Sequence, residues 1–322
     1  TDEEAERIIE LMLRDGSAEK LDALIHPNSY YVRSHVSDVE RSSTRTFICS
    51  LSEDDAGPSN NWMDPVFMRD QMAHLFNGCM QGRVMYVVPY LLGPPGSPAA
   101  RVGVQVTDSP YVVANLRLMN RIGRVALEHF GNQTGFVKGI HSVGTLDPEQ
   151  RYVCHFPEEN LIVSMNTNYG SDAMLPKKCH ALRLASVQAR HEGWLAEHMM
   201  IICVTSPDGV RTFIAGAFPA SCGKTNLAML LPPDADLAAG WKVEVIGDDI
   251  AWMHFGDDGR LYAVNSEAGF FGVATGTSSA SNPNGMETLR SNTIFTNVAM
   301  TEERSVWWEG LDGDVPEFCA DW

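Results

Sequence analysis

The chain has 322 residues, of which 44% are hydrophobic, enough to bury a large core in what we expect to be two domains. Its 41 acidic residues outnumber 24 basic ones, and the net charge of −17 argues against general binding to nucleic acids or anionic membranes. Seven cysteines without a pairing pattern are typical of a reducing compartment, so we expect a cytoplasmic protein.

Hydrophobic spacing predicts both helices and strands in the first half of the chain. Apolar residues at helical spacing predict one helix over residues 3–14 and another over residues 115–130. A proline-rich stretch at residues 93–100 predicts a surface loop. The strands expected here are residues 84–92, 102–106 and 161–165. No apolar run reaches membrane-spanning length, and the acidic segment 2–6 does not resemble a signal peptide.

The second half of the chain opens with a predicted hairpin. Strands are expected at residues 199–205 and 211–217, on either side of the turn sequence Ser-Pro-Asp-Gly at 206–209. Another strand is expected at residues 242–246, and a further strand-like run at 250–255 follows it without a helix. We place a domain boundary near Gly193, which divides the chain into residues 1–193 and 194–322.

Residues 218–226, Phe-Pro-Ala-Ser-Cys-Gly-Lys-Thr-Asn, end like a phosphate-binding loop. An expected strand precedes them and a helical pattern at residues 226–231 follows, which is the context that such a loop needs. Lys224 would then reach the outer phosphates of a nucleotide, and Thr225 would hold a magnesium or manganese ion. Phe218 stands where the usual pattern has its first glycine, so a chance Gly-Lys-Thr triplet is the alternative.

Two carboxylates follow the expected strand at residues 242–246. Asp248 and Asp249 stand where loops meet ligands in α/β sheets, and an aspartate there commonly holds the cation of a nucleotide. The alternative is a turn or a helix cap, because aspartate favours both.

A third cluster lies upstream. It comprises Tyr-Gly-Ser-Asp at 169–172, the pair Lys177 and Lys178, and Glu197 followed by His198. Lysines near a histidine suggest an anion site with a metal ligand. The alternatives are a solvated lysine face and a structural histidine, and spacing alone does not show that these side chains converge.

Five stretches of sequence together resemble one family. They are YGSDAMLPKKCHALRLAS at 169–186, GWLAEHM at 193–199, FPASCGKTNLAML at 218–230, VIGDDIAWM at 245–253 and SNTIFTNVA at 291–299. In this order they resemble the GTP-dependent phosphoenolpyruvate carboxykinases, and the resemblance extends along nearly the whole chain. It implies a mixed α/β fold with two lobes and a P-loop in the second.

The resemblance implies an activity and a set of site residues. Family members decarboxylate oxaloacetate and phosphorylate the enolate with GTP, giving phosphoenolpyruvate, GDP and CO₂ in gluconeogenesis. The implied ligands of an active-site Mn²⁺ are Lys178, His198 and Asp249. The implied substrate contacts are Arg41, Tyr169, Gly170, Ser171 and Ala220. The implied nucleotide contacts, which include a second Mg²⁺ or Mn²⁺, are Ser221, Cys222, Gly223, Lys224, Thr225 and Asn226. The implied catalytic residues are Cys222, Lys178 and Arg41.

Cys222 is expected to be chemically reactive. A thiol at a helix start near Lys224 should react readily, although the function of the loop itself needs only the backbone of this residue. The sequence reads Ala-Ser at 220–221 where the family has Ser-Ala, and Ser-Asp at 171–172 where it has Gly-Asn. Either change could alter substrate binding.

Three readings of function stay open. Family members continue beyond residue 322 through a guanine pocket and a lid, so we expect little turnover from this chain alone. The readings are a carboxykinase, a nucleotide- or metal-binding fragment without turnover, and a relative that uses pyrophosphate or ITP. We expect a monomer with small-molecule substrates and without nucleic-acid or membrane partners.

Overall fold

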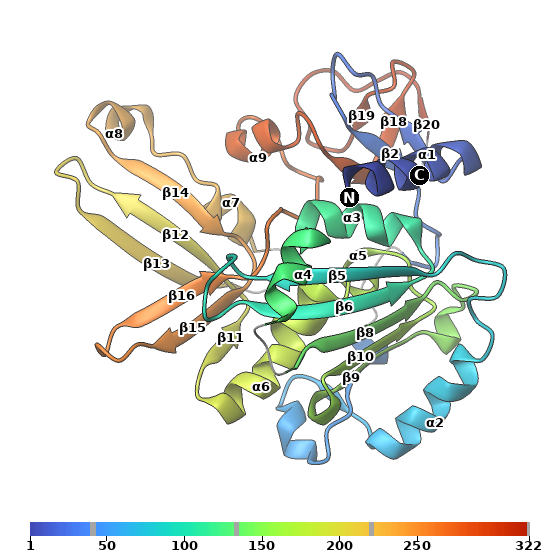
Figure 1. The fold of residues 1–322 in the computed structure, drawn as a ribbon. Coiled ribbons are helices and arrows are strands. Elements are labelled where there is room, and N and C mark those ends of the chain that lie inside the picture. Colours follow the sequence, from blue (N-terminus) through green and yellow to red (C-terminus); the bar gives the residue numbers. More distant parts are fainter. Residues whose placement is uncertain (39–42, 132–134, 219–221, 321–322) are drawn as a thin grey trace. The chain divides into compact units, whose positions relative to one another are not determined.

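The computed structural model, drawn in Figure 1, describes residues 1–38, 43–131, 135–218 and 222–320. The chain forms two compact units. The first unit comprises Thr1–Arg14, Ser34–Ala196 and Ser266–Gly269. The second comprises Asp15–Arg33, Glu197–Asn265 and Phe270–Trp322. Each unit therefore contains segments that are distant in sequence. The expected mixed α/β fold is confirmed.

An eight-stranded mixed sheet forms the centre of the first unit, with strand order β4-β3-β9-β10-β8-β6-β5-β7. Its strands β9, β10, β8, β6 and β5 lie side by side in Figure 1. The middle strands β6, β8 and β10 run parallel, and β5 pairs with β6 as an antiparallel hairpin. The three strands predicted in this half are confirmed to within two residues. The bounds are β3 (Thr46–Ile48), β4 (Asn61–Trp62), β5 (Tyr86–Leu92), β6 (Arg101–Thr107), β7 (Arg121–Ile122), β8 (Val137–Ser142), β9 (Tyr152–Phe156) and β10 (Leu161–Met165).

Helices of the first unit begin where the sequence provides caps. Ser109 accepts a hydrogen bond from the Val112 amide at the start of α3, and Pro110 fills the first helical position. Asp64 caps α2 in the same way. The bounds are α1 (Asp2–Asp15), α2 (Pro65–Phe76), α3 (Pro110–Met119), α4 (Arg124–Phe130), α5 (Gly170–Ala173) and α6 (Ala185–Glu192), with a π-helix at Pro176–Leu184. Short 3₁₀ turns are Ser43–Arg45, Glu53–Ala56, Pro148–Gln150 and Pro157–Glu159.

The single helix predicted over residues 115–130 is wrong. Helix α3 ends at Met119, residues 121–122 pair with β5 as strand β7, and a separate helix α4 begins at Arg124. Gly123 between them has φ 69° and ψ −129°, a conformation that only glycine adopts without strain. Apolar spacing continues across this break, which is why periodicity alone joined the two helices.

Two antiparallel arrangements dominate the P-loop part of the second unit. Strand β12 (Met199–Thr205) lies between β13 (Arg211–Ala217) and β14 (Lys242–Gly247), and the predicted hairpin turn at 206–209 is confirmed. Strand β15 (Ala251–Phe255) pairs with β16 (Leu261–Asn265). Short helices α7 (Lys224–Ala228) and α8 (Asp234–Ala238) lie between β13 and β14 in sequence. Strand β11 (Leu195–Glu197) lies where the chain passes from the first unit to the second.

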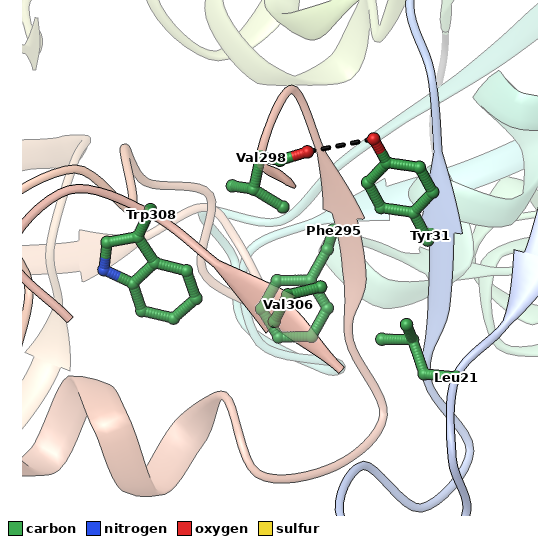
Figure 2. Packing of buried hydrophobic residues seen from close by; sticks show 6 residues of the cluster. All are labelled: Leu21, Tyr31, Phe295, Val298, Val306 and Trp308. Atoms are coloured by element: carbon green, nitrogen blue, oxygen red, sulfur yellow. Dashed lines mark hydrogen bonds between the residues drawn. The ribbon is translucent and has the colours of Figure 1, made fainter. Parts of the chain in front are cut away.

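The remaining core of the second unit joins two ends of the sequence. Strand β2 (Tyr30–Val32) pairs with β1 (Ala18–Lys20) and runs parallel to β17 (Ile294–Thr296). Figure 2 shows the cluster beside them, where the Tyr31 hydroxyl donates to the Val298 carbonyl at 2.9 Å. The buried members are Leu21, Tyr31, Phe295, Val298, Val306 and Trp308. Nearby elements are α9 (Pro283–Thr288), β18 (Ala299–Thr301), β19 (Val306–Trp307) and β20 (Cys319–Ala320).

Across the described ranges of the chain, none of the helices combines the length and the apolar character that crossing a bilayer requires.

Candidate nucleotide and metal site

A strand and a helix flank the glycine-lysine-threonine sequence, as predicted. Strand β13 precedes the loop and α7 begins at Lys224, with Gly223 as its N-cap in a left-handed conformation of φ 88°. A glycine suits this position because other residues are strained at such angles. Helix α7 ends earlier than the predicted run 226–231. Ala220 and Ser221 belong to residues 219–221, which lie outside the described residues.

Lys224 points toward the aspartates that follow β14. Its Nζ donates to the Asp249 Oδ1 at 2.8 Å and to the Asp248 carbonyl at 2.6 Å. The Asp249 carbonyl lies 3.4 Å from the same nitrogen. Only 7% of the lysine side chain is exposed. The ammonium group of the predicted phosphate loop is therefore held by oxygen atoms of two consecutive residues.

His198 contacts the same carboxylate. Its Nε2 lies 2.7 Å from the Asp249 Oδ1, so the ring nitrogen and the Lys224 ammonium share one oxygen. The sheet explains this meeting. Ile201 pairs with Gly247 in the antiparallel β12–β14 ladder, so the residues just before β12 and just after β14 lie at one end of it. His198 and Asp249 are predicted metal ligands from distant parts of the sequence, and the fold brings them together.

Asp248 and Asn282 contact the loop helix; sequence reasoning proposed the Asp248–Asp249 pair as a holder of the nucleotide's cation but gave Asn282 no role. The Thr225 hydroxyl donates to the Asp248 Oδ2 at 3.0 Å, and Asp248 is almost fully buried. The side-chain amide of Asn282, the N-cap of α9, donates to the Asn226 Oδ1 at 3.0 Å. The Asp-Asp sequence was a visible signal for the first contact. The second depends on a pairing across 56 residues that has no local signature.

The donor atoms beside Lys224 suit a divalent cation. An imidazole nitrogen and a carboxylate oxygen are ligands that manganese accepts, and His198 and Asp249 already bring one of each into contact. In the described part of the chain, no group of three or more histidine, cysteine or carboxylate side chains is placed to hold a metal ion. The role of His198, Asp249 and Lys178 as a ligand set stays a prediction.

Of the third predicted cluster, residues 169–172, Lys177 and Lys178 lie in the first unit, at α5 and the π-helix, whereas Glu197 and His198 belong to the second unit. Lys177 and Lys178 are both buried, so the alternative of a solvated lysine face is wrong. The Lys177 Nζ donates to the Glu267 Oε1 at 2.7 Å, and this carboxylate, which sequence reasoning missed, is also buried. π-Helices are rare, and the short π-bulges in which they mostly occur are frequent at functional sites.

Tyr169, Gly170 and Ser171 begin the short helix α5 at the same cluster. Gly170 has φ 59° and is buried, as is Ser171. The preceding Asn168 amide donates to Asp38, a buried carboxylate whose pKa is raised by burial. Arg41, the predicted carboxylate ligand, belongs to residues 39–42, which lie outside the described residues.

Comparisons with known proteins agree on one family. Residues 1–190 match the model of the phosphoenolpyruvate carboxykinase N-terminal domain, and residues 194–322 match that of the phosphoenolpyruvate carboxykinase C-terminal P-loop domain. The chain is similar to the phosphoenolpyruvate carboxykinase [GTP] of Corynebacterium jeikeium, with 50% identity over 100% of this chain and 54% of the relative. The phosphoenolpyruvate carboxykinase [GTP] of Corynebacterium kroppenstedtii is 52% identical over 100% of this chain and 53% of its own length.

A relative from another genus supports the same family assignment. The phosphoenolpyruvate carboxykinase [GTP] of Anaeromyxobacter dehalogenans is 50% identical over 94% of this chain and 50% of its own length. The chain thus spans about half the length of the curated relatives that it matches. Because two domain models and several half-identical relatives cover nearly all of it, the chain belongs to the GTP-dependent phosphoenolpyruvate carboxykinase family.

Proposed function

We propose that the protein carrying this chain is a GTP-dependent phosphoenolpyruvate carboxykinase. It would decarboxylate oxaloacetate and transfer the γ-phosphoryl group of GTP to the resulting enolate, giving phosphoenolpyruvate, GDP and CO₂. The observation that carries the proposal is the meeting of Lys224 and Thr225 of the loop with Asp248, Asp249 and His198. Phosphoryl transfer needs this combination of a phosphate-binding lysine, a hydroxyl and cation-holding carboxylates.

The second unit supplies the nucleotide contacts. The backbone of residues 221–226 would bind the phosphates, and Lys224 would neutralise their charge. Thr225 and Asp248 would hold the Mg²⁺ or Mn²⁺ of the nucleotide, since their side chains already contact each other. The exposed Cys222 would lie beside the phosphates, where its thiol is reactive but not required for transfer.

The metal and substrate contacts complete the proposal. His198, Asp249 and Lys178 would hold the active-site Mn²⁺, which when bound stabilises negative charge on the enolate oxygen. Arg41 would bind a substrate carboxylate with two parallel hydrogen bonds. Tyr169, Gly170, Ser171 and Ala220 would line the substrate pocket.

The organisation of the protein is part of the same proposal. Residues 1–193 would form the substrate lobe and residues 194–322 part of the nucleotide lobe. A cytoplasmic location is supported by the seven cysteines, none of which forms a disulfide in the described parts of the chain. The protein would act as a monomer on small molecules.

Lys224→Ala in a protein of the relatives' full length tests the proposal. We expect GTP-dependent formation of phosphoenolpyruvate to be abolished, while decarboxylation of oxaloacetate to pyruvate persists because it does not use the loop. Lys242→Ala, at an exposed strand start, is the matched control and should retain both activities. Loss of both activities in equal measure would contradict the assignment of Lys224 to phosphoryl transfer. Running the assay with GTP, ITP and pyrophosphate identifies the phosphoryl donor.

A further inference from the structure

The Asp249 carboxylate is the meeting point of two side chains that the proposed function uses for different ligands. Its Oδ1 accepts a hydrogen bond from the Lys224 Nζ at 2.8 Å and lies 2.7 Å from the His198 Nε2. The proposed function assigns Lys224 to phosphate, and Asp249 and His198 to a divalent cation. All three residues belong to the second unit, so the geometry is internal to one compact body.

An ammonium group and a divalent cation compete for such an oxygen. Two positive charges within a few ångströms of one another repel strongly where water is largely excluded. Lys224 and Asp249 are 7% and 11% exposed, so solvent screens this repulsion poorly. A cation coordinated by Asp249 Oδ1 must therefore displace the lysine from it.

The surroundings of Lys224 show how firmly it is held. The Asp248 carbonyl accepts a second hydrogen bond at 2.6 Å, and the Asp248 carboxylate is occupied by the Thr225 hydroxyl. The lysine is thus bound to the backbone as well as to the carboxylate that the cation would need. Two of the three ammonium donors are therefore engaged by oxygen atoms of the chain itself, and release from Asp249 would free one of them for a phosphate.

We propose that Lys224 has a second role as a built-in counter-ion of Asp249, which a divalent cation displaces and thereby makes available for phosphate. This inference rests on the proposed function, because it takes the cation site and the phosphate role of Lys224 from it. Its consequence is reciprocal: the cation promotes binding of the phosphate group, and the phosphate group promotes binding of the cation.

Mn²⁺ binding to the purified chain tests the inference without any measurement of activity. Free Mn²⁺ is followed by electron paramagnetic resonance in titrations of the wild type, Lys224→Gln and Lys224→Arg. We expect Lys224→Gln to bind Mn²⁺ about tenfold more tightly, because a charge-assisted hydrogen bond no longer competes. Lys224→Arg keeps the competing charge and should stay near the wild type. Lys242→Gln removes a charge from an exposed position of the same unit and should also leave the affinity unchanged.

A second measurement uses the unmodified chain and so does not depend on how a variant folds. Lysines are acetylated briefly with and without Mn²⁺, and the products are quantified by mass spectrometry. Lys224 is buried in its contact with Asp249, so Mn²⁺ should increase its acetylation, whereas the exposed Lys242 should react equally in both samples. Unchanged or reduced acetylation of Lys224, or unchanged Mn²⁺ affinity of a folded Lys224→Gln, would overturn the inference.

Two further variants separate this inference from the proposed function. If His198→Gln and Asp249→Asn leave Mn²⁺ affinity unchanged, or the chain binds no Mn²⁺, the metal assignment itself fails and the inference fails with it. If both variants weaken binding while the Lys224 variants have no effect, the metal site stands and only the competition is rejected.

Discussion

At the scale of single residues, three buried histidines make stability depend on pH. Burial lowers the pKa of His141 to about 4 and those of His155 and His180 to about 3. An unfolded histidine titrates near 6.5, so below that pH the unfolded chain binds more protons than the folded one. Stability is therefore complete above pH 6.5 and is lost as the pH falls toward 4 and then 3.

We expect the free energy of unfolding of the first unit to fall between pH 6.5 and 4. The slope should reach up to about 1.4 kcal/mol per pH unit for each histidine. Urea titrations at several pH values measure it, and His155→Gln should make the curve less steep. A free energy that stays constant from pH 7 to pH 4.5 would show that these rings are not held neutral in the fold.

The seven cysteines should differ widely in their reactivity toward an alkylating reagent. Cys222 and Cys319 are exposed, whereas Cys49, Cys154 and Cys203 are buried, and burial raises the pKa of Cys179 to about 12. We expect Cys222 to be labelled first, because its thiol is exposed and the residue lies in the predicted phosphate loop just before α7. Nucleotide should protect it, while Cys319 provides the exposed control. Peptide mapping that finds Cys222 inert while Cys319 reacts would contradict this.

At the scale of elements, the segment 266–269 is anchored to the first unit by contacts at both ends. The Ser266 carbonyl accepts from the Gly93 amide at 2.8 Å, and the Ala268 amide donates to the Met119 carbonyl at 2.9 Å. Glu267, which lies between them, forms an ion pair with Lys177. The Glu267 side chain is 2% exposed and the Lys177 side chain is 4% exposed. This pair links the segment to the start of the π-helix.

Removing only one of the two charges of this ion pair should lower the free energy of unfolding markedly. Lys177→Met would leave a buried carboxylate without its main counter-ion, and we expect a loss of about 3–5 kcal/mol in the free energy of unfolding. The double variant Lys177→Met with Glu267→Gln removes both charges and should recover much of that loss. Guanidinium denaturation of both variants measures the difference. A double variant as unstable as the single one would show that the charge is not the cause.

Periodicity predicted the elements whose pattern is local, and it failed where one residue changes the backbone. The strands at 161–165, 199–205 and 211–217 were predicted with the bounds they have, because each has a clear apolar pattern and turn residues beside it. The long helix failed at Gly123, whose conformation is not encoded in hydrophobic spacing. Strand β2 was missed, since it is short and pairs with a strand more than 260 residues away.

In the candidate site, too, sequence reasoning found the residues that belong to a local pattern and missed those that meet across the fold. The strand-loop-helix context, Lys224 and the aspartates after β14 were visible in local sequence, and the antiparallel β12–β14 ladder explains why His198 joins them. Glu267 was missed because it meets Lys177 across 90 residues, and no spacing rule marks such a contact. Sequence reasoning thus identifies the residues that a motif contains, and the fold adds the partners that hold them.

At the scale of the whole molecule, two surface properties act against each other in self-association. Strand β13 is an edge strand of its sheet, and its Phe213 and Ile214 are 61% and 41% exposed. An exposed apolar edge strand is a template for pairing with another chain. The net charge of −17 opposes such contacts through repulsion between copies.

The salt concentration should determine whether apolar pairing of the edge strand or repulsion between the charged chains dominates. It screens the repulsion, since the Debye length falls from about 10 Å at 0.1 M to about 3 Å at 1 M, while apolar contacts persist. We therefore expect this chain to sediment as a monomer at low salt and to form larger species as salt is raised. Phe213→Lys places a charge on the edge strand and should suppress the change, whereas Val210→Lys, in the neighbouring turn, should not. If analytical ultracentrifugation finds the two variants affected alike, net charge rather than the strand edge controls association.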